Sequence, residues 1–332
     1  MLKLTLLFIL QMVLGFSVNS WGAPNTAAST VNGDPSLVSQ AWYIERIELP
    51  RAWRTVRETP DVPVGVIDMD FDLSHEELKE AFDDRYSLDF SGKNFSEISL
   101  DAKYSQHGTL VSAIIGANGV NAVGITGISQ RARMIAINVA PVGKAIDIEE
   151  VMRYTIDSGA KVINCSFGYV SIKPDLMEKL RRALRYAQEK DVLIVAAAGN
   201  YGRDNDKEPF YPSSFSVEFP NVISVGATAE DDSHFYASSY GKKHVDIFAP
   251  GRNIIVPADA TRYVLSSGTS EAAPIVSGVA SLMRQINPRL SAAQVKKILM
   301  QTSDKKEQLR AISVSGGRVN AARAVEAAEV AR

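Results

Sequence analysis

Ser270 lies in a stretch of small residues that leads directly into an apolar helical pattern. The stretch reads Ser266-Ser267-Gly268-Thr269-Ser270-Glu271-Ala272-Ala273-Pro274, and apolar residues follow at helical spacing as far as Met283. A serine at the start of such a helix lies beside unpaired backbone N–H groups and the positive end of the peptide dipoles, and both stabilise an anion that forms there. This setting suits a nucleophilic serine; the alternative is a simple helix N-cap.

A general base, and an acid to orient it, stand earlier in the chain. His107 opens a helical pattern after a polar stretch, and Asp68 ends a short apolar run. Each of these residues alone is also a common helix cap or surface residue. Together, Asp68, His107 and Ser270 supply the acid, the base and the nucleophile with which a serine hydroxyl attacks a carbonyl group.

The elements that must position these residues alternate along the chain. Apolar runs rich in β-branched residues predict strands, and apolar residues at three-to-four spacing predict helices. The expected strands are 62–67, 134–139, 161–167, 192–197, 222–225 and 244–248, and the expected helices between them are 107–117, 148–158 and 174–188. This pattern predicts a three-layer α/β fold, with a mostly parallel central sheet and helices on both faces. Asp68, Ser166 and Gly199-Asn200 follow the carboxyl ends of strands, where functional groups gather in such folds.

The composition is that of an ordinary globular protein. Of 332 residues, 45% are hydrophobic and 22% are charged, and 36 basic against 38 acidic residues give a net charge of −2. Since there is no basic run, binding to nucleic acid is not expected. The single cysteine, Cys165, excludes an internal disulfide and lies in an apolar run, where we expect a buried structural thiol.

The amino-terminal segment has the form of a secretory signal peptide. One charge, on Lys3, precedes an apolar run from Leu4 to Gly15 that is short for a membrane span. We expect residues 1–22 to be removed and residues 23–41 to form a flexible lead-in. The mature protein is then exported, either to a periplasm or to the medium, without stable membrane insertion. An uncleaved signal anchor is the alternative.

Three motifs surround the candidate residues. They are Val64-Gly65-Val66-Ile67-Asp68, His107-Gly108-Thr109-Leu110-Val111-Ser112 and Gly268-Thr269-Ser270-Glu271-Ala272-Ala273-Pro274. In this order they resemble the aspartate, histidine and serine motifs of the subtilase family of serine proteases (peptidase S8 type). The segments 159–168, 196–200, 210–214, 222–227 and 248–251 are similar to the family as well. The resemblance runs from about Trp42 to about Ala324 and implies a subtilisin-like catalytic domain over residues 42–332.

The resemblance implies a serine-type endopeptidase (EC 3.4.21.-) that hydrolyses protein or peptide substrates through an acyl-enzyme. Ser270 would attack the scissile carbonyl, His107 would take its proton, and Asp68 would orient the imidazole. Asn200 would donate to the oxyanion, and no cofactor is required. The implied substrate-binding residues are Ser166, Phe167, Gly168, Tyr169 and Gly199.

Four departures from the family pattern bear on this function. Asp70 and Glu271 place extra carboxylates beside the acid and the nucleophile, where the family usually has Gly and Met. Tyr169 replaces a glycine and is expected to narrow the primary specificity pocket. Residues 23–41 leave no room for a folded pro-domain, so the chain either folds unaided or uses a separate folding partner. A catalytically idle subtilase fold that acts as a binding module is the alternative function.

A structural calcium ion is a further expectation from the same resemblance. The loop Asn118-Gly119-Val120-Asn121-Ala122-Val123 is similar to the family's calcium loop, and Glu77 falls at a carboxylate ligand position. The candidate ligands are therefore Glu77, Asn118 and Asn121, whose oxygen atoms suit calcium. The loop is one residue longer than usual, and a plain turn is the alternative.

Overall fold

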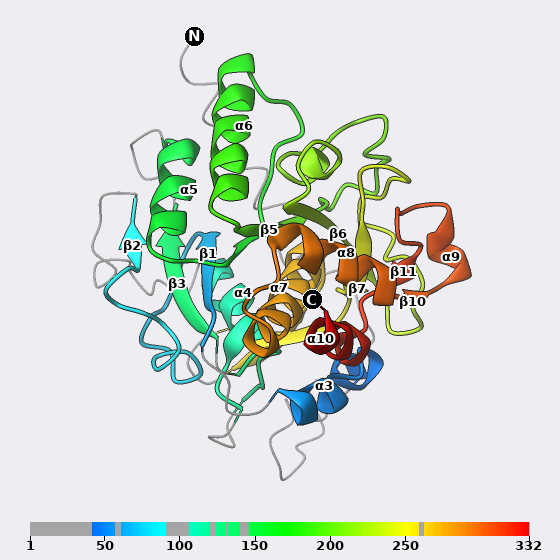
Figure 1. Cartoon of the computed structure of the whole chain (residues 1–332), viewed down its shortest axis with the longest axis horizontal. Helices are drawn as coiled ribbons and strands as arrows, with labels where there is room; N and C mark the ends of the chain where they lie inside the picture. The colour runs from blue at the N-terminus through cyan, green and yellow to red at the C-terminus, as the bar shows by residue number, and fades with distance from the viewer. Residues whose placement is uncertain are drawn as a thin grey trace. The chain divides into compact units, whose positions relative to one another are not determined.

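A central sheet, built from the apolar runs of the sequence, positions the candidate residues (Figure 1). The computed structural model describes residues 42–56, 61–90, 106–119, 124–130, 132–139, 146–258 and 262–331. The expected signal peptide and lead-in lie outside these residues, as does Asn121. Within the described residues, no helix combines the length and the apolar character needed to cross a membrane.

The sheet has nine strands in the order β10-β11-β7-β6-β5-β4-β1-β3-β2. Every neighbouring pair is parallel except β10 and β11, which are antiparallel. The strands are β1 (Pro63–Asp68), β2 (Leu88–Asp89), β3 (Arg133–Asn138), β4 (Val162–Cys165), β5 (Leu193–Ala197), β6 (Val222–Thr228), β7 (Ile247–Pro250), β10 (Asp304–Lys305) and β11 (Gly317–Arg318). A separate antiparallel hairpin joins β8 (Ile254–Pro257) to β9 (Tyr263–Ser266).

Helices cover both faces of this sheet (Figure 1). The α-helices of the described residues are α3 (Leu49–Thr55), α4 (His107–Gly116), α5 (Ile148–Asp157), α6 (Pro174–Glu189), α7 (Thr269–Ile286), α8 (Ala292–Thr302), α9 (Glu307–Arg310) and α10 (Ala321–Val330). On β1, Val64 and Val66 pack into the hydrophobic cluster that includes α4 and α7, whereas Ile67 packs into the cluster that includes α5 and α6. Both faces of the strands are buried, which explains their continuous apolar sequence. The predicted α/β fold is confirmed.

The predicted boundaries agree with the structure to within one residue for α4, α5 and α6. The last predicted strand, 244–248, differs, because β7 begins only at Ile247. Asp246 turns inward there, accepts a hydrogen bond from the Ser224 N–H at 2.9 Å and pairs with Lys296 at 3.1 Å. A buried carboxylate needs such partners, and this requirement outweighs the strand pattern.

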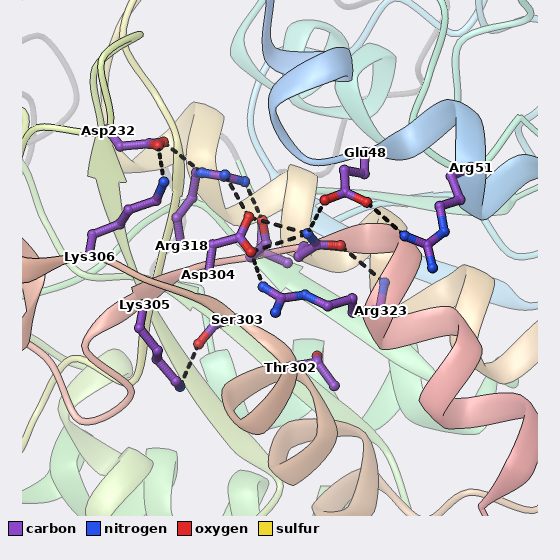
Figure 2. Close-up of polar contacts among 12 residues, drawn as sticks. Glu48, Arg51, Asp232, Thr302, Ser303, Asp304, Lys305, Lys306, Arg318 and Arg323 are labelled. Carbon is purple, nitrogen blue, oxygen red and sulfur yellow. Dashed lines mark hydrogen bonds and ion pairs between the residues drawn. The ribbon is translucent and has the colours of Figure 1, made fainter.

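A group of charged side chains ties the segment before α3 to the C-terminal strands (Figure 2). Buried Arg318 donates to Asp232 at 2.6 Å and to Asp304 at 2.7 Å. Asn320 donates to Glu48, the residue before α3, at 2.9 Å. We call Asp232, Asp304, Lys306, Arg318 and Arg323 the C-terminal charge cluster, in which Lys306 also pairs with Asp232 and Arg323 with Asp304.

Candidate active site

Asp68 closes β1, His107 opens α4, and their side chains are hydrogen-bonded. Asp68 Oδ1 lies 2.6 Å from His107 Nδ1 and also accepts the Met69 N–H at 2.8 Å. The Gly108 N–H, which has no partner within its own helix, donates to the Met69 carbonyl at 2.7 Å and so fixes the helix start against the strand end. With Nδ1 engaged, Nε2 is the ring nitrogen left to accept a proton.

The environment of His107 favours its protonated form. Burial alone lowers the pKa of the imidazole, but the charge and hydrogen bond of Asp68 act in the opposite direction. Glu271 and Asp70 add two further negative charges, and the net result is a pKa of about 9. The His107 side chain is 18% exposed, so it can be reached from solvent.

Asp70 adopts a left-handed backbone conformation, with φ of 59°. This conformation favours glycine and is tolerated by aspartate, which accounts physically for the glycine expected here from the family pattern. The Asp70 N–H donates to buried Asn138 at 3.0 Å, which stabilises the turn. Burial raises the pKa of the Asp70 carboxyl, the charge of Asp68 raises it further, and His107 partly offsets both.

Ser270 is the second residue of α7 and lies against the end of β4. Its hydroxyl donates to the Ser166 carbonyl at 3.3 Å, and the Ser166 hydroxyl donates to the Ser270 carbonyl at 3.0 Å. Pro274, four residues further along the helix, has no N–H, so the Ser270 carbonyl is free to accept this bond. Among the described residues, no hydrogen bond joins Ser270 to His107. The charge of Glu271, the residue after Ser270, is one of the causes that raise the pKa of His107.

Asn200 is held beside the start of α7 by Thr269. The Thr269 N–H and hydroxyl both donate to Asn200 Oδ1, at 2.8 and 2.9 Å, and the Gly199 N–H donates to the Thr269 hydroxyl at 3.1 Å. Because two donors hold the amide oxygen, Nδ2 is left to donate elsewhere. It lies beside Gly268, where a Cβ would come within 2.8 Å of Nδ2. The glycine therefore makes room for the amide group.

Glu271 is buried directly after Ser270, with an exposed fraction of 3%. Its carboxylate accepts a hydrogen bond from the Ser266 hydroxyl at 2.6 Å. Burial raises the pKa of Glu271, while the Ser266 hydrogen bond and the charge of His107 lower it in part. The side chain thus points into the site rather than into solvent.

The expected substrate-binding residues follow the ends of the neighbouring strands β4 and β5. The Phe167 and Tyr169 rings contact each other, with centroids 6.3 Å apart, and pack against the cluster beneath α5 and α6. Gly168 between them faces the other way, towards Phe210. Phe210, which was not expected in this role, also contacts Gly199. It is 42 residues from Gly168 in the sequence, so no local pattern indicates this contact.

The expected calcium ligand Glu77 is engaged by protein donors. Its Oε1 atom accepts the Tyr263 hydroxyl at 2.5 Å and the Ile125 N–H at 2.8 Å. The Asn118 N–H donates to the Glu77 backbone carbonyl at 3.0 Å. In the described ranges, no group of three or more His, Cys, Asp or Glu side chains could hold a metal ion. These residues therefore fit a hydrogen-bonded role for Glu77 better than a calcium site, and calcium binding stays a prediction.

Known proteins are similar to this chain in sequence and in fold. A model of the subtilase family matches residues 59–317, so the chain belongs to the subtilase family of serine proteases. It is 33% identical over 282 residues to the thermophilic serine proteinase of Bacillus sp. (strain AK1), covering 82% of this chain and 64% of that protein. It is 31% identical over 302 residues to thermitase of Thermoactinomyces vulgaris, covering 88% of this chain and 98% of that protein.

A solved structure shares the fold. The epidermin leader peptide processing serine protease of Staphylococcus aureus superposes with a TM-score of 0.75, covering 91% of this chain and 84% of that chain. The two sequences are 22% identical, so this similarity concerns the fold alone. It agrees with the mostly parallel sheet and the helices on both of its faces.

Proposed function

We propose that this chain is an exported serine endopeptidase in which Asp68, His107 and Ser270 act as the triad. The observation that carries the proposal is the 2.6 Å hydrogen bond between Asp68, at the end of β1, and His107, at the start of α4. Ser270 Oγ bonds to the scissile carbonyl carbon as its proton passes to His107 Nε2. The C–N bond then breaks, and the same proton goes to the leaving amine. Water, activated by His107, hydrolyses the acyl-enzyme.

Asn200 Nδ2 and the Ser270 N–H are the donors we assign to the oxyanion. The hydroxyl of Ser270 must leave the Ser166 carbonyl in order to donate to His107, and a substrate backbone that pairs with Ser166 would displace it. This mode of pairing, in which a peptide is added as a strand along residues 166–168, leaves alternate substrate side chains free to enter pockets.

The binding-module alternative has one observation in its favour. Since the pKa of His107 is about 9, the imidazole is mostly protonated at pH 7 and cannot then act as a base. The proposed peptidase is therefore most active in alkaline solution. Casein or peptide hydrolysis near pH 9, compared between the wild-type protein and Ser270→Ala, tests the proposal. Hydrolysis that persists in Ser270→Ala, or is absent from folded wild-type protein, would refute it.

Export of the mature chain belongs to the same proposal. It is supported by the short apolar run after Lys3, which is followed by small residues. N-terminal sequencing of the protein from its native host should give a start near residue 23 in a soluble fraction. A start at Met1 in the membrane fraction would favour the signal anchor instead.

A further inference from the structure

We infer that Phe210 closes the pocket for the substrate side chain next to the cleaved bond, so that the enzyme selects peptides with a small residue at that position. This position, P1, is the residue whose carbonyl Ser270 attacks. The inference rests on the proposed peptidase function and goes beyond it, because it names the substrate class. It is carried by the position of one aromatic ring between two chain segments.

The first step concerns where the P1 residue lies. Ser270 and Ser166 exchange two hydrogen bonds, so the attacked carbonyl lies next to the segment that begins at Ser166. The proposed oxyanion donor Asn200 follows β5, the strand next to β4, and Thr269 binds its amide oxygen at the start of α7. The P1 residue is thus placed between residues 166–168 and residues 199–200.

The second step concerns what the P1 side chain meets there. Gly168 and Gly199 lack side chains, and the space beside each is taken by the ring of Phe210. A Cβ at position 168 would overlap Phe210 Cε1 and lie 2.6 Å from Cζ, and a Cβ at position 199 would lie 3.1 Å from Cδ1. Phe210 is only 7% exposed. The ring therefore fills the space that the two glycines leave.

The third step concerns whether the ring can move aside. The backbone of Phe210 is held on both sides, since its N–H donates to the Ser214 hydroxyl at 2.9 Å and its carbonyl accepts the Ser213 hydroxyl at 2.8 Å. Next to it, Tyr211 pairs with Tyr169 through two backbone hydrogen bonds of 2.7 and 3.0 Å. The Tyr201 ring packs on Phe210 with centroids 5.9 Å apart. These contacts hold the ring in place, so glycine, alanine or serine fits at P1 and larger residues do not.

The test measures kcat/KM for peptide p-nitroanilides that differ only at P1, with Gly, Ala, Val, Leu or Phe. For the wild-type protein, we expect kcat/KM for the Ala substrate to be about 100-fold or more above kcat/KM for the Phe substrate, because a closed pocket excludes the larger side chain. Phe210→Ala should raise kcat/KM for P1 Leu and Phe by at least about tenfold and leave P1 Ala nearly unchanged. Phe210→Val, a smaller change, should shift the profile in the same direction if Phe210→Ala folds poorly.

Phe82→Ala is the matched control, since Phe82 is also only 7% exposed but packs on Phe71 beside β3. It should leave the P1 profile unchanged. The inference is overturned if the wild-type protein has equal kcat/KM values for P1 Phe and P1 Ala. It is also overturned if Phe210→Ala and Phe210→Val have the same P1 profile as the wild type. Either result leaves the peptidase function intact. If no substrate is cleaved and Ser270 takes up no fluorophosphonate in the folded wild-type protein, the proposed function fails and the inference fails with it.

Discussion

Thr269 holds Asn200 by two hydrogen bonds to the same amide oxygen, at 2.8 Å from its N–H and 2.9 Å from its hydroxyl. The residue before the proposed nucleophile thus orients the proposed oxyanion donor. Asn200 lies at the end of β5, and Thr269 begins a helix that starts 69 residues later. The contact therefore joins two motifs that are remote in the sequence.

Thr269→Val should consequently lower kcat without raising KM. The valine keeps the shape and the backbone donor but loses the hydroxyl, so Asn200 is held less firmly. We expect a loss of about tenfold in kcat, smaller than the loss of about 10² to 10³ expected for Asn200→Ala. Steady-state kinetics on one peptide substrate measures both values.

Thr155→Val is the control for this prediction. Thr155 is also buried, but its hydroxyl donates to Val151 within α5, away from the site. The kcat and KM of Thr155→Val should match those of the wild type. A Thr269→Val protein with unchanged kcat would mean that the hydroxyl has no part in placing Asn200.

Glu271→Gln should move the acid limb of the kcat/KM profile to lower pH. The Glu271 charge contributes to the raised pKa of His107, about 9, so its removal lowers that pKa. The neutral imidazole is the base, and a lower pKa makes it available at lower pH. Glutamine can still accept the Ser266 hydrogen bond, so the change isolates the charge.

The measurement is the full pH profile of kcat/KM for both proteins. Glu178→Gln, which alters an exposed ion pair with Arg181, serves as the control and should leave the profile where it is. Because Glu271 is buried, added salt should reduce the difference only slightly. An acid limb that does not move in Glu271→Gln would show that this carboxylate does not act on His107.

Arg318→Ala should destabilise the folded state by about 3 kcal/mol or more, because it leaves Asp232 and Asp304 without their buried partner. Both carboxylates belong to the C-terminal charge cluster in Figure 2. Arg310→Ala breaks an exposed pair with Glu307 and should cost less than about 1 kcal/mol. Urea unfolding of the three proteins gives the free energies; similar values for both variants would argue against a stabilising role of the cluster.

Removal of calcium with a chelator should leave the thermal midpoint of the wild-type protein unchanged. Glu77 Oε1 already accepts hydrogen bonds from Tyr263 and Ile125, and these bonds stabilise the carboxylate without a metal ion. Tyr263→Phe should instead destabilise the protein by about 1 to 3 kcal/mol, since the buried Glu77 carboxylate loses one of its donors. A midpoint that rises with added calcium would restore the calcium site expected from the sequence.

The sequence was informative wherever chemistry depends on neighbouring residues. The strand that ends at Asp68, the helix that begins at His107 and the turn before Ser270 are all local patterns, and their elements were predicted closely. The position of Phe210 was not predictable in this way. Its ring reaches Gly168 beside an isolated pairing of Tyr211 with Tyr169, and such a contact depends on tertiary structure.

The same limit applies to charged residues. The pairing of Asn320 with Glu48 spans 272 positions, and neither residue lies in a recognisable motif. Asp70 and Glu271 could be identified as departures from the family pattern, but their burial and their effect on His107 required the fold. Periodicity therefore indicated the sheet, and the motifs that resemble the subtilase family indicated the candidate reactive residues, whereas the electrostatics of the site came from packing.

The most direct test of the central claim is the rate at which a fluorophosphonate labels Ser270 as a function of pH. If Asp68 and His107 activate this serine, the second-order rate constant should rise with pH through about 9, following the deprotonation of His107. Labelling should disappear in Ser270→Ala and fall by roughly 10⁴-fold or more in His107→Ala, with little further loss when Asp68→Ala is added. A folded wild-type protein that is not labelled, or whose labelling rate is unaffected by both pH and His107→Ala, would contradict the account.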